Sequence, residues 1–90
     1  MSLEVGALVI STSGRDCGTV MAVIALNQGY AVLANGRKCR IDKPKSKKLK
    51  HVRPIGHKLS DGTLQLLTDG ILTDKLLYSD IRQILMSEKV

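Results

Sequence analysis

Residues 19–26, Thr-Val-Met-Ala-Val-Ile-Ala-Leu, restrict the fold of this 90-residue chain more than any other segment. The segment is rich in β-branched side chains, which favours a strand. Alternation along such a strand gives two sets of side chains, Val20, Ala22, Ile24 and Leu26 on one face and Met21, Val23 and Ala25 on the other. Both faces are apolar and both need burial. In a chain this small, the segment predicts a curled sheet or barrel with another element packed outside it.

Four further segments are predicted to complete the sheet. Residues 5–12 and 30–34 have strand composition, and Asn35-Gly36 is a strong hairpin signal because both positions tolerate positive φ. Residues 37–41 would then return as a fourth strand, with Lys38 and Arg40 on one face. Residues 49–53 would be a short fifth strand, and five short strands with tight turns predict a small barrel.

The pattern becomes helical after Leu59. Pro54 and Gly56 are expected to end the barrel, which divides the chain into residues 1–56 and a helical appendage, residues 57–90. Ser60 is the expected N-cap of a first helix, and Gly70 its stop.

A second helix is indicated by apolar residues at helical spacing, namely Leu77, Ile81, Ile84 and Leu85. Either Thr73 or Ser79 could cap it, and Asp80 would lie in the first turn of a helix that begins at Ser79. We expect the apolar stripe to cover the outer face of the strand at residues 19–26. The alternative is a dimer contact through the same stripe.

Positive charge is concentrated inside the chain. Ten of the fourteen Lys and Arg residues lie between Arg37 and Lys58, and Asp42 is the only acid among them. Such a field suits a polyanion, because each neutralised phosphate releases condensed counterions. Because the segment follows predicted strands, we interpret it as a binding face rather than a solvated tail.

Other compositional features exclude several classes of protein. The chain has no Phe and no Trp, so it cannot build the aromatic platform on which sheet-based binders stack unpaired bases. The two cysteines, Cys17 and Cys39, lack metal-site spacing with His51 and His57, and we expect neither metal nor cofactor. No spacing joins a nucleophile to a base and an acid, so we expect no enzyme. No apolar run could span a membrane and no basic n-region precedes one, so we expect a cytoplasmic protein.

A glycine-bounded turn follows the first predicted strand. Gly14 and Gly18 suit positive φ or a close backbone approach, Arg15 lies at the tip of the turn, and Asp16 could cap turn amides. The guanidinium of Arg15 could grip a phosphate through two parallel hydrogen bonds.

This turn and the segments after it together resemble the KOW family. The residues concerned are Gly14-Arg15-Asp16-x-Gly18, an apolar strand, Tyr30-x-Val32-Leu33-x-Asn35-Gly36-Arg37-x-x-Arg40 and Lys43-Pro44-Lys45-x-Lys47-Lys48-Leu49-Lys50-His51. The resemblance is to the small bacterial RNA-binding members, which are akin to a large-subunit ribosomal protein of archaea and eukaryotes. It implies a mainly β fold with C-terminal helices, namely a five-stranded SH3-like barrel covered by one or two α-helices. It also implies RNA binding and a role in translation or at the ribosome, with Gly18 as the structural glycine of the motif.

The expected function is therefore binding of structured, ribosomal RNA. The expected contacts are Arg15, Lys38, Arg40, Lys43, Lys45, Lys47, Lys48, Lys50 and Arg53, with Gly14 and Gly18 shaping the loop. Cys17 stands where the family often has a basic residue, so more of the contact is assigned to residues 37–53. The alternative is a protein-interaction module that docks on transcription or ribosomal proteins through the acidic C-terminal third.

Overall fold

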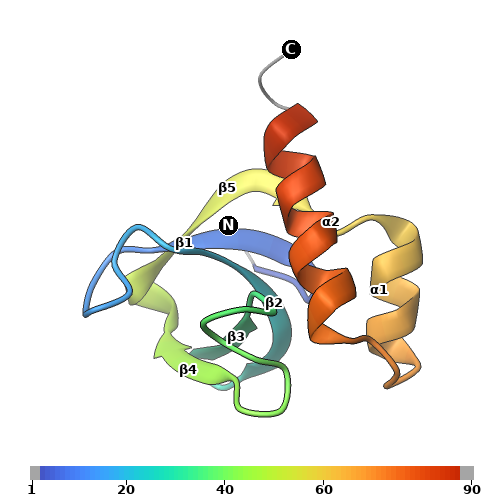
Figure 1. Cartoon of the computed structure of the whole chain (residues 1–90). Coiled ribbons are helices and arrows are strands. Elements are labelled where there is room, and N and C mark those ends of the chain that lie inside the picture. The colour runs from blue at the N-terminus through green and yellow to red at the C-terminus, as the bar shows by residue number, and fades with distance from the viewer. Residues whose placement is uncertain (1–2, 88–90) are drawn as a thin grey trace.

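The computed structural model describes residues 3–87 and contains five strands followed by two helices (Figure 1). The strands are β1 (Ala7–Ser11), β2 (Val20–Asn27), β3 (Tyr30–Ala34), β4 (Lys45–Lys48) and β5 (Val52–Lys58), and a 3-10 turn, η1 (Leu49–His51), joins the last two. The helices are α1 (Asp61–Thr68) and α2 (Asp74–Ser87). The prediction of a mainly β chain with C-terminal helices is confirmed. Neither helix has the length and apolar character needed to cross a membrane.

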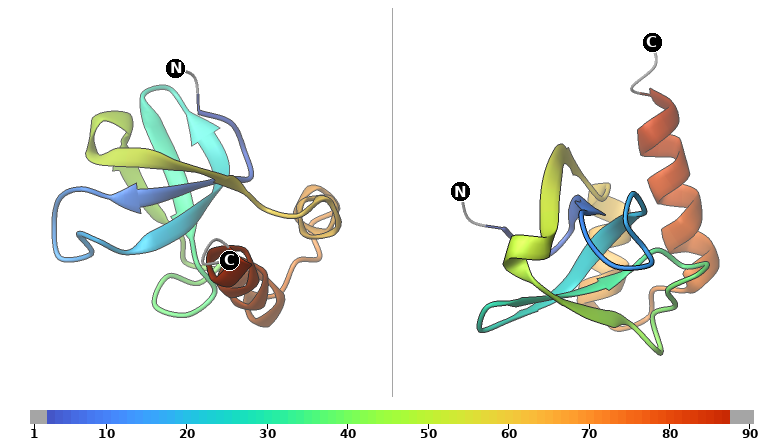
Figure 2. Two further views of the ribbon diagram at one scale, coloured as in Figure 1. Left: turned by 90° about the horizontal axis from the view of Figure 1, so that it is seen from above. Right: turned by 90° about the vertical axis from the view of Figure 1, so that its left-hand side faces the viewer.

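All five strands form one antiparallel sheet in the order β4-β3-β2-β1-β5. The pairing shifts register between Ala7 and Val9 in β1, and between Val23 and Ala25 in β2. Such bulges bend a strand and increase its twist, and the sheet is accordingly curled (Figure 2). Strands β4 and β5 are its two edges, and they do not pair with each other within residues 3–87. The sheet is therefore not closed.

The first half of strand β2 is buried on both faces, as its sequence predicted, whereas Leu26 near its end is exposed. On one face Ala22 belongs to an apolar cluster with Leu8, Ala34, Leu59, Leu72, Leu77 and Ile81. On the other face Met21 and Val23 pack with Val9, Ala31 and Leu33. Because Leu77 and Ile81 belong to α2, this helix covers the outer face of β2 (Figure 1), which confirms the predicted position of the stripe.

The ends of α1 agree with the sequence prediction. Ser60 occupies the N-cap position with extended backbone angles, and Asp61 opens the helix. At the other end Gly70 adopts a φ of +76°, and its N–H donates to the carbonyl of Leu67. The left-handed glycine thus stops the helix and satisfies one of its last carbonyl groups.

Helix α2 is capped by Thr73 rather than by Ser79. The Thr73 hydroxyl accepts a hydrogen bond of 3.3 Å from the backbone N–H of Leu76, in the first turn. Asp80 consequently lies in the middle of the helix, away from the first turn. Its carboxylate accepts hydrogen bonds of 3.0 Å from the backbone N–H and the hydroxyl of Ser60. Asp80 therefore ties the start of α1 to α2.

The prediction of a strand at residues 37–41 is wrong, because Asn35 and Gly36 begin a compact loop instead of a two-residue hairpin turn. The Asn35 carboxamide oxygen accepts hydrogen bonds from the backbone N–H groups of Arg37 and Cys39, both at 3.0 Å. The N–H groups of Asn35 and Gly36 both donate to the carbonyl of Cys39. Of the pair, Gly36 has positive φ and Asn35 does not, so the turn is not of the hairpin type.

The last two strands also differ from the prediction. Strand β4 lies inside the lysine run, where its Lys-Ser-Lys-Lys sequence has little strand character, and residues 49–51 form η1. Strand β5 passes through Pro54 and Gly56 to Lys58, beyond the expected end of the sheet. Pro54 is tolerated because β5 is an edge strand that pairs only with β1.

Candidate nucleic-acid interface

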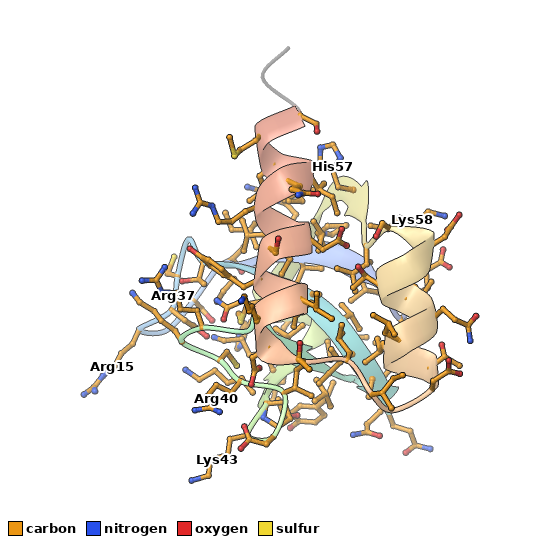
Figure 3. The ribbon with its side chains drawn as sticks, turned by 45° about the vertical axis from the view of Figure 1, so that its right-hand side comes forward. Arg15, Arg37, Arg40, Lys43, His57 and Lys58 are labelled. Atoms are coloured by element: carbon orange, nitrogen blue, oxygen red, sulfur yellow. The ribbon has the colours of Figure 1, made fainter. Side chains whose placement is uncertain are left out.

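The β1–β2 loop, residues 12–19, is a compact turn closed by backbone hydrogen bonds. The N–H of Gly18 donates to the carbonyl of Ser11 at 2.8 Å, and the N–H of Cys17 donates to that of Gly14 at 3.2 Å. Gly14 and Gly18 both adopt positive φ, at +84° and +90°, as their sequence predicted. Arg15 lies exposed at the tip and extends away from the body of the protein (Figure 3).

Asp16 and Lys47 connect this loop to strand β4. The Nζ atom of Lys47 lies 2.9 Å from Asp16 Oδ1 and donates to the carbonyl of Ser13 at 2.7 Å. The side chains of Asp16 and Lys47 are each only 14% exposed. Lys47 lies opposite the buried Ala31 in the sheet and points to its inner face. Lys47 therefore holds the loop, and it is not placed to meet a partner directly.

The carboxylate of Asp16 has three neighbours that favour its charged form. Burial favours the neutral acid, but hydrogen bonds from Lys47 and Ser11 and the charges of Lys47 and Lys45 outweigh it. The pKa of Asp16 is therefore lower than usual. Its second oxygen, Oδ2, is buried without a hydrogen bond and lies 3.5 Å from the Nζ atom of Lys45. Asp16 thus fixes one lysine and attracts another.

Asp16 lines a depression that we call the basic hollow, with a volume of about 370 Å³. It is lined by residues of the β1–β2 loop, β2, the β3–β4 loop and β4, and its cations are Arg15, Lys38, Lys43 and Lys45. Asp16 is the carboxylate among the lining residues. Lys38 and Lys43 are exposed, so their ammonium groups can reach an anion without first breaking an ion pair with a described residue. The hollow is the largest gathering of predicted contact residues at one place.

The other predicted contacts lie outside the basic hollow. Arg40 is paired with Asp74 at 3.4 Å and Asp42 at 3.6 Å, although its side chain is 66% exposed and such surface pairs are weak. Lys48, Lys50 and Arg53 are exposed on the segment from the end of β4 through η1 to β5. The nine predicted residues therefore divide into four at the hollow, one structural lysine, one paired arginine and three on a separate segment.

Two further basic residues were not predicted as contacts. Arg37, in the β3–β4 loop, donates a hydrogen bond of 2.9 Å from Nη1 to the hydroxyl of Tyr78 on α2. The guanidinium of Arg82, one turn further along α2, lies 5.9 Å from the centre of the same ring. The four-residue spacing of Tyr78 and Arg82 could have revealed that they share a helix face, but not that Arg37 joins them from 41 residues away.

The cysteines and the metal-binding residue types form no comparable site. Cys39 is half-buried and its thiol donates to the carbonyl of Leu33 at 3.1 Å, while burial raises the pKa of the Cys39 thiol. Cys17 is exposed in the β1–β2 loop. Within residues 3–87, no group of three or more His, Cys, Asp and Glu side chains is arranged to hold a metal ion.

No protein-family model matches the chain, and no curated protein matches its sequence. The assignment of function therefore depends on the basic hollow and on the motif residues around it.

Proposed function

We propose that this protein is a non-catalytic module that binds structured RNA through the basic hollow. The observation that carries the proposal is that four cations from three elements, Arg15, Lys38, Lys43 and Lys45, line one depression. Cations that converge on a concave site are favourable for phosphate because they neutralise neighbouring charges together. Ribosomal RNA is the proposed ligand class, because the motif residues resemble KOW proteins that act in translation or at the ribosome.

The arrangement of the strands supports an SH3-like architecture for this module. Each strand pairs with its neighbour in sequence through β4, and β1 returns to pair with β5. The 3-10 turn η1 connects the two edge strands. A curled five-stranded sheet with this order needs only its edges to approach to become a small barrel. The positive φ of Gly18 is consistent with the structural glycine of the KOW motif.

The test is RNA binding by variants of the hollow. Lys38→Gln and Lys43→Gln, singly and together, should weaken binding to a folded ribosomal RNA fragment, and each should lower the slope of log K against log salt by about 0.7 to 0.9. If about six phosphates are neutralised, the wild-type slope should be about −5 on a duplex and about −4 on a single strand. Lys58→Gln is the matched control, because Lys58 is exposed on the side of α1, away from Arg15 and Lys43 (Figure 3). A flat salt dependence, or equal effects of all three substitutions, would reject the proposal.

A second candidate function, docking of a protein partner, is supported by a separate groove. The groove has a volume of about 730 Å³, and its lining includes Val5, Leu26 and Leu49, which are 37–41% exposed. Leu49→Asp should abolish binding to such a partner and leave RNA binding intact. Charge reversal at Lys38 and Lys43 should do the opposite, so the two variants separate the two functions.

A further inference from the structure

Tyr78 gathers two arginines from separate parts of the chain. The guanidinium carbon of Arg37 lies 5.2 Å from the centre of the Tyr78 ring, and that of Arg82 lies 5.9 Å from it. Arg37 also donates to the phenol hydroxyl at 2.9 Å. This hydrogen bond and the two positive charges lower the pKa of Tyr78. Both guanidinium groups therefore act on the same phenol.

Among the residues that the structure describes, the two arginines have no carboxylate partner. In residues 3–87 neither Arg37 nor Arg82 takes part in an ion pair, whereas Arg40 in the same loop has two. Tyr78 supplies a ring face and a hydroxyl, which attract the guanidinium groups but do not neutralise them. Two like charges held at one neutral ring repel each other, and an anion bound between them would relieve this repulsion. Arginine also presents paired donors that match the oxygens of a phosphate.

The backbone around Arg37 fixes the loop against α2. The N–H of Arg37 donates to the Asn35 carboxamide at 3.0 Å, and that of Ile41 donates to the Asp74 carboxylate at 2.8 Å. Gly36 lies directly against the backbone of Asp74 at the start of α2. These contacts therefore hold Arg37 beside α2, and the loop does not need to rearrange to place it there.

Arg37 is also next to the basic hollow. It directly precedes Lys38, which lines the hollow, and Arg15, Arg37, Arg40 and Lys43 lie on one side of the molecule (Figure 3). Resting on the function proposed above, we propose that Arg37 and Arg82, gathered by Tyr78, form a second phosphate site on α2. This site binds the backbone of the same RNA next to the part held in the hollow. The RNA-binding face thus extends from the loops of the sheet onto the C-terminal helix.

Arg82→Gln tests this site with little risk to the fold, because Arg82 is exposed. We expect affinity for the folded RNA fragment to fall roughly 10-fold, as for loss of a charged hydrogen bond, and the salt slope to fall by about 0.7 to 0.9. Arg82→Lys should retain the slope but regain only part of the affinity, since it keeps the charge and loses the fork. Lys58→Gln, which removes one charge elsewhere, should lower the affinity and the salt slope less than Arg82→Gln does.

The outcomes separate this site from the main proposal. If Arg82→Gln binds RNA with the same affinity as Lys58→Gln while Lys38→Gln binds more weakly, the second site is rejected. The proposal that RNA binds at the basic hollow is then retained. If Lys38→Gln and Lys43→Gln have no specific effect, the proposed function is rejected, and the second site with it. Poly-glutamate is measured in parallel. If Arg82→Gln weakens poly-glutamate binding as much as RNA binding, the site binds carboxylates as well and its assignment to phosphate is overturned.

Discussion

At the scale of single residues, Asp16 determines how the lysines of the basic hollow are arranged. Its carboxylate holds Lys47 at 2.9 Å beneath the β1–β2 loop and attracts Lys45 at 3.5 Å. Asp16→Asn removes the charge but keeps the shape, and it leaves the largely buried side chain of Lys47 without a counter-charge. We expect a loss of about 1 to 3 kcal/mol in the free energy of unfolding, measured by urea unfolding at neutral pH.

The same substitution should change the dependence of stability on pH. Because the pKa of Asp16 is lower in the folded than in the unfolded state, its contribution is complete above the unfolded value of about 3.9. The contribution is lost as pH falls from there through the folded pKa. The wild-type protein should therefore lose more stability below about pH 4 than Asp16→Asn. Asp42→Asn is the control, because Asp42 is 68% exposed and its ion pair is weak. An equal acid response in all three proteins would contradict the role of Asp16.

The residue types of the candidate site could be predicted from the sequence, but the directions in which their side chains point could not. The charge density and the positive φ of Gly14 and Gly18 follow from composition and turn chemistry. Lys47 was expected to contact RNA, and its inward direction follows only from the alternation of β4. That strand was not recognised, because its sequence carries little β propensity and its position is set by pairing with β3.

At the scale of elements, Gly36 controls how closely the β3–β4 loop approaches α2. Its φ is +80°, and a Cβ atom there would overlap the backbone carbonyl oxygen of Asp74. Gly36→Ala must therefore move one of two backbone segments, and we expect a loss of more than about 2 kcal/mol in stability. Gly29→Ala is the matched control, because Gly29 has a φ of +75° but no atom within 4 Å of its added Cβ. Thermal unfolding should show a clearly smaller loss for Gly29→Ala, and equal losses would show that φ alone explains the effect.

Gly36 also explains why the Asn-Gly pair misled the prediction of a hairpin. Both the hairpin and the observed loop use a glycine of positive φ at this position. In the observed loop, the Asn35 side chain accepts hydrogen bonds from the backbone N–H groups of Arg37 and Cys39, and this distinguishes it from the hairpin. They differ also in the nearby backbone of α2, which is distant in sequence. The local pattern was sufficient for β2 and α1, because the apolar residues of the strand and the capping residues of the helix are visible in the segment itself. It failed for the β3–β4 loop, because an element distant in sequence determines the structure there.

At the scale of the whole molecule, the helices and the sheet share one apolar cluster. Leu77 of α2 is fully buried with Leu8 of β1 and Ala22 of β2. Asp80 adds hydrogen bonds from α2 to Ser60 at the start of α1. The helices therefore complete the outer face of the sheet, and we expect the chain to unfold in one cooperative transition.

This cooperativity can be tested with Leu77→Ala, which should lower stability by about 2 to 5 kcal/mol through the cavity it leaves. Because the cavity adjoins β1 and β2, hydrogen exchange of their amides should accelerate as much as that of α2. Leu76→Ala, at a neighbouring position that is 48% exposed, should change stability by less than about 0.5 kcal/mol. If Leu77→Ala loosened α2 while the amides of β1 and β2 kept their protection, the helices would be an independent appendage. The proposed RNA-binding face could then not extend rigidly from the sheet onto α2, because the position of Arg82 relative to the basic hollow depends on this shared core.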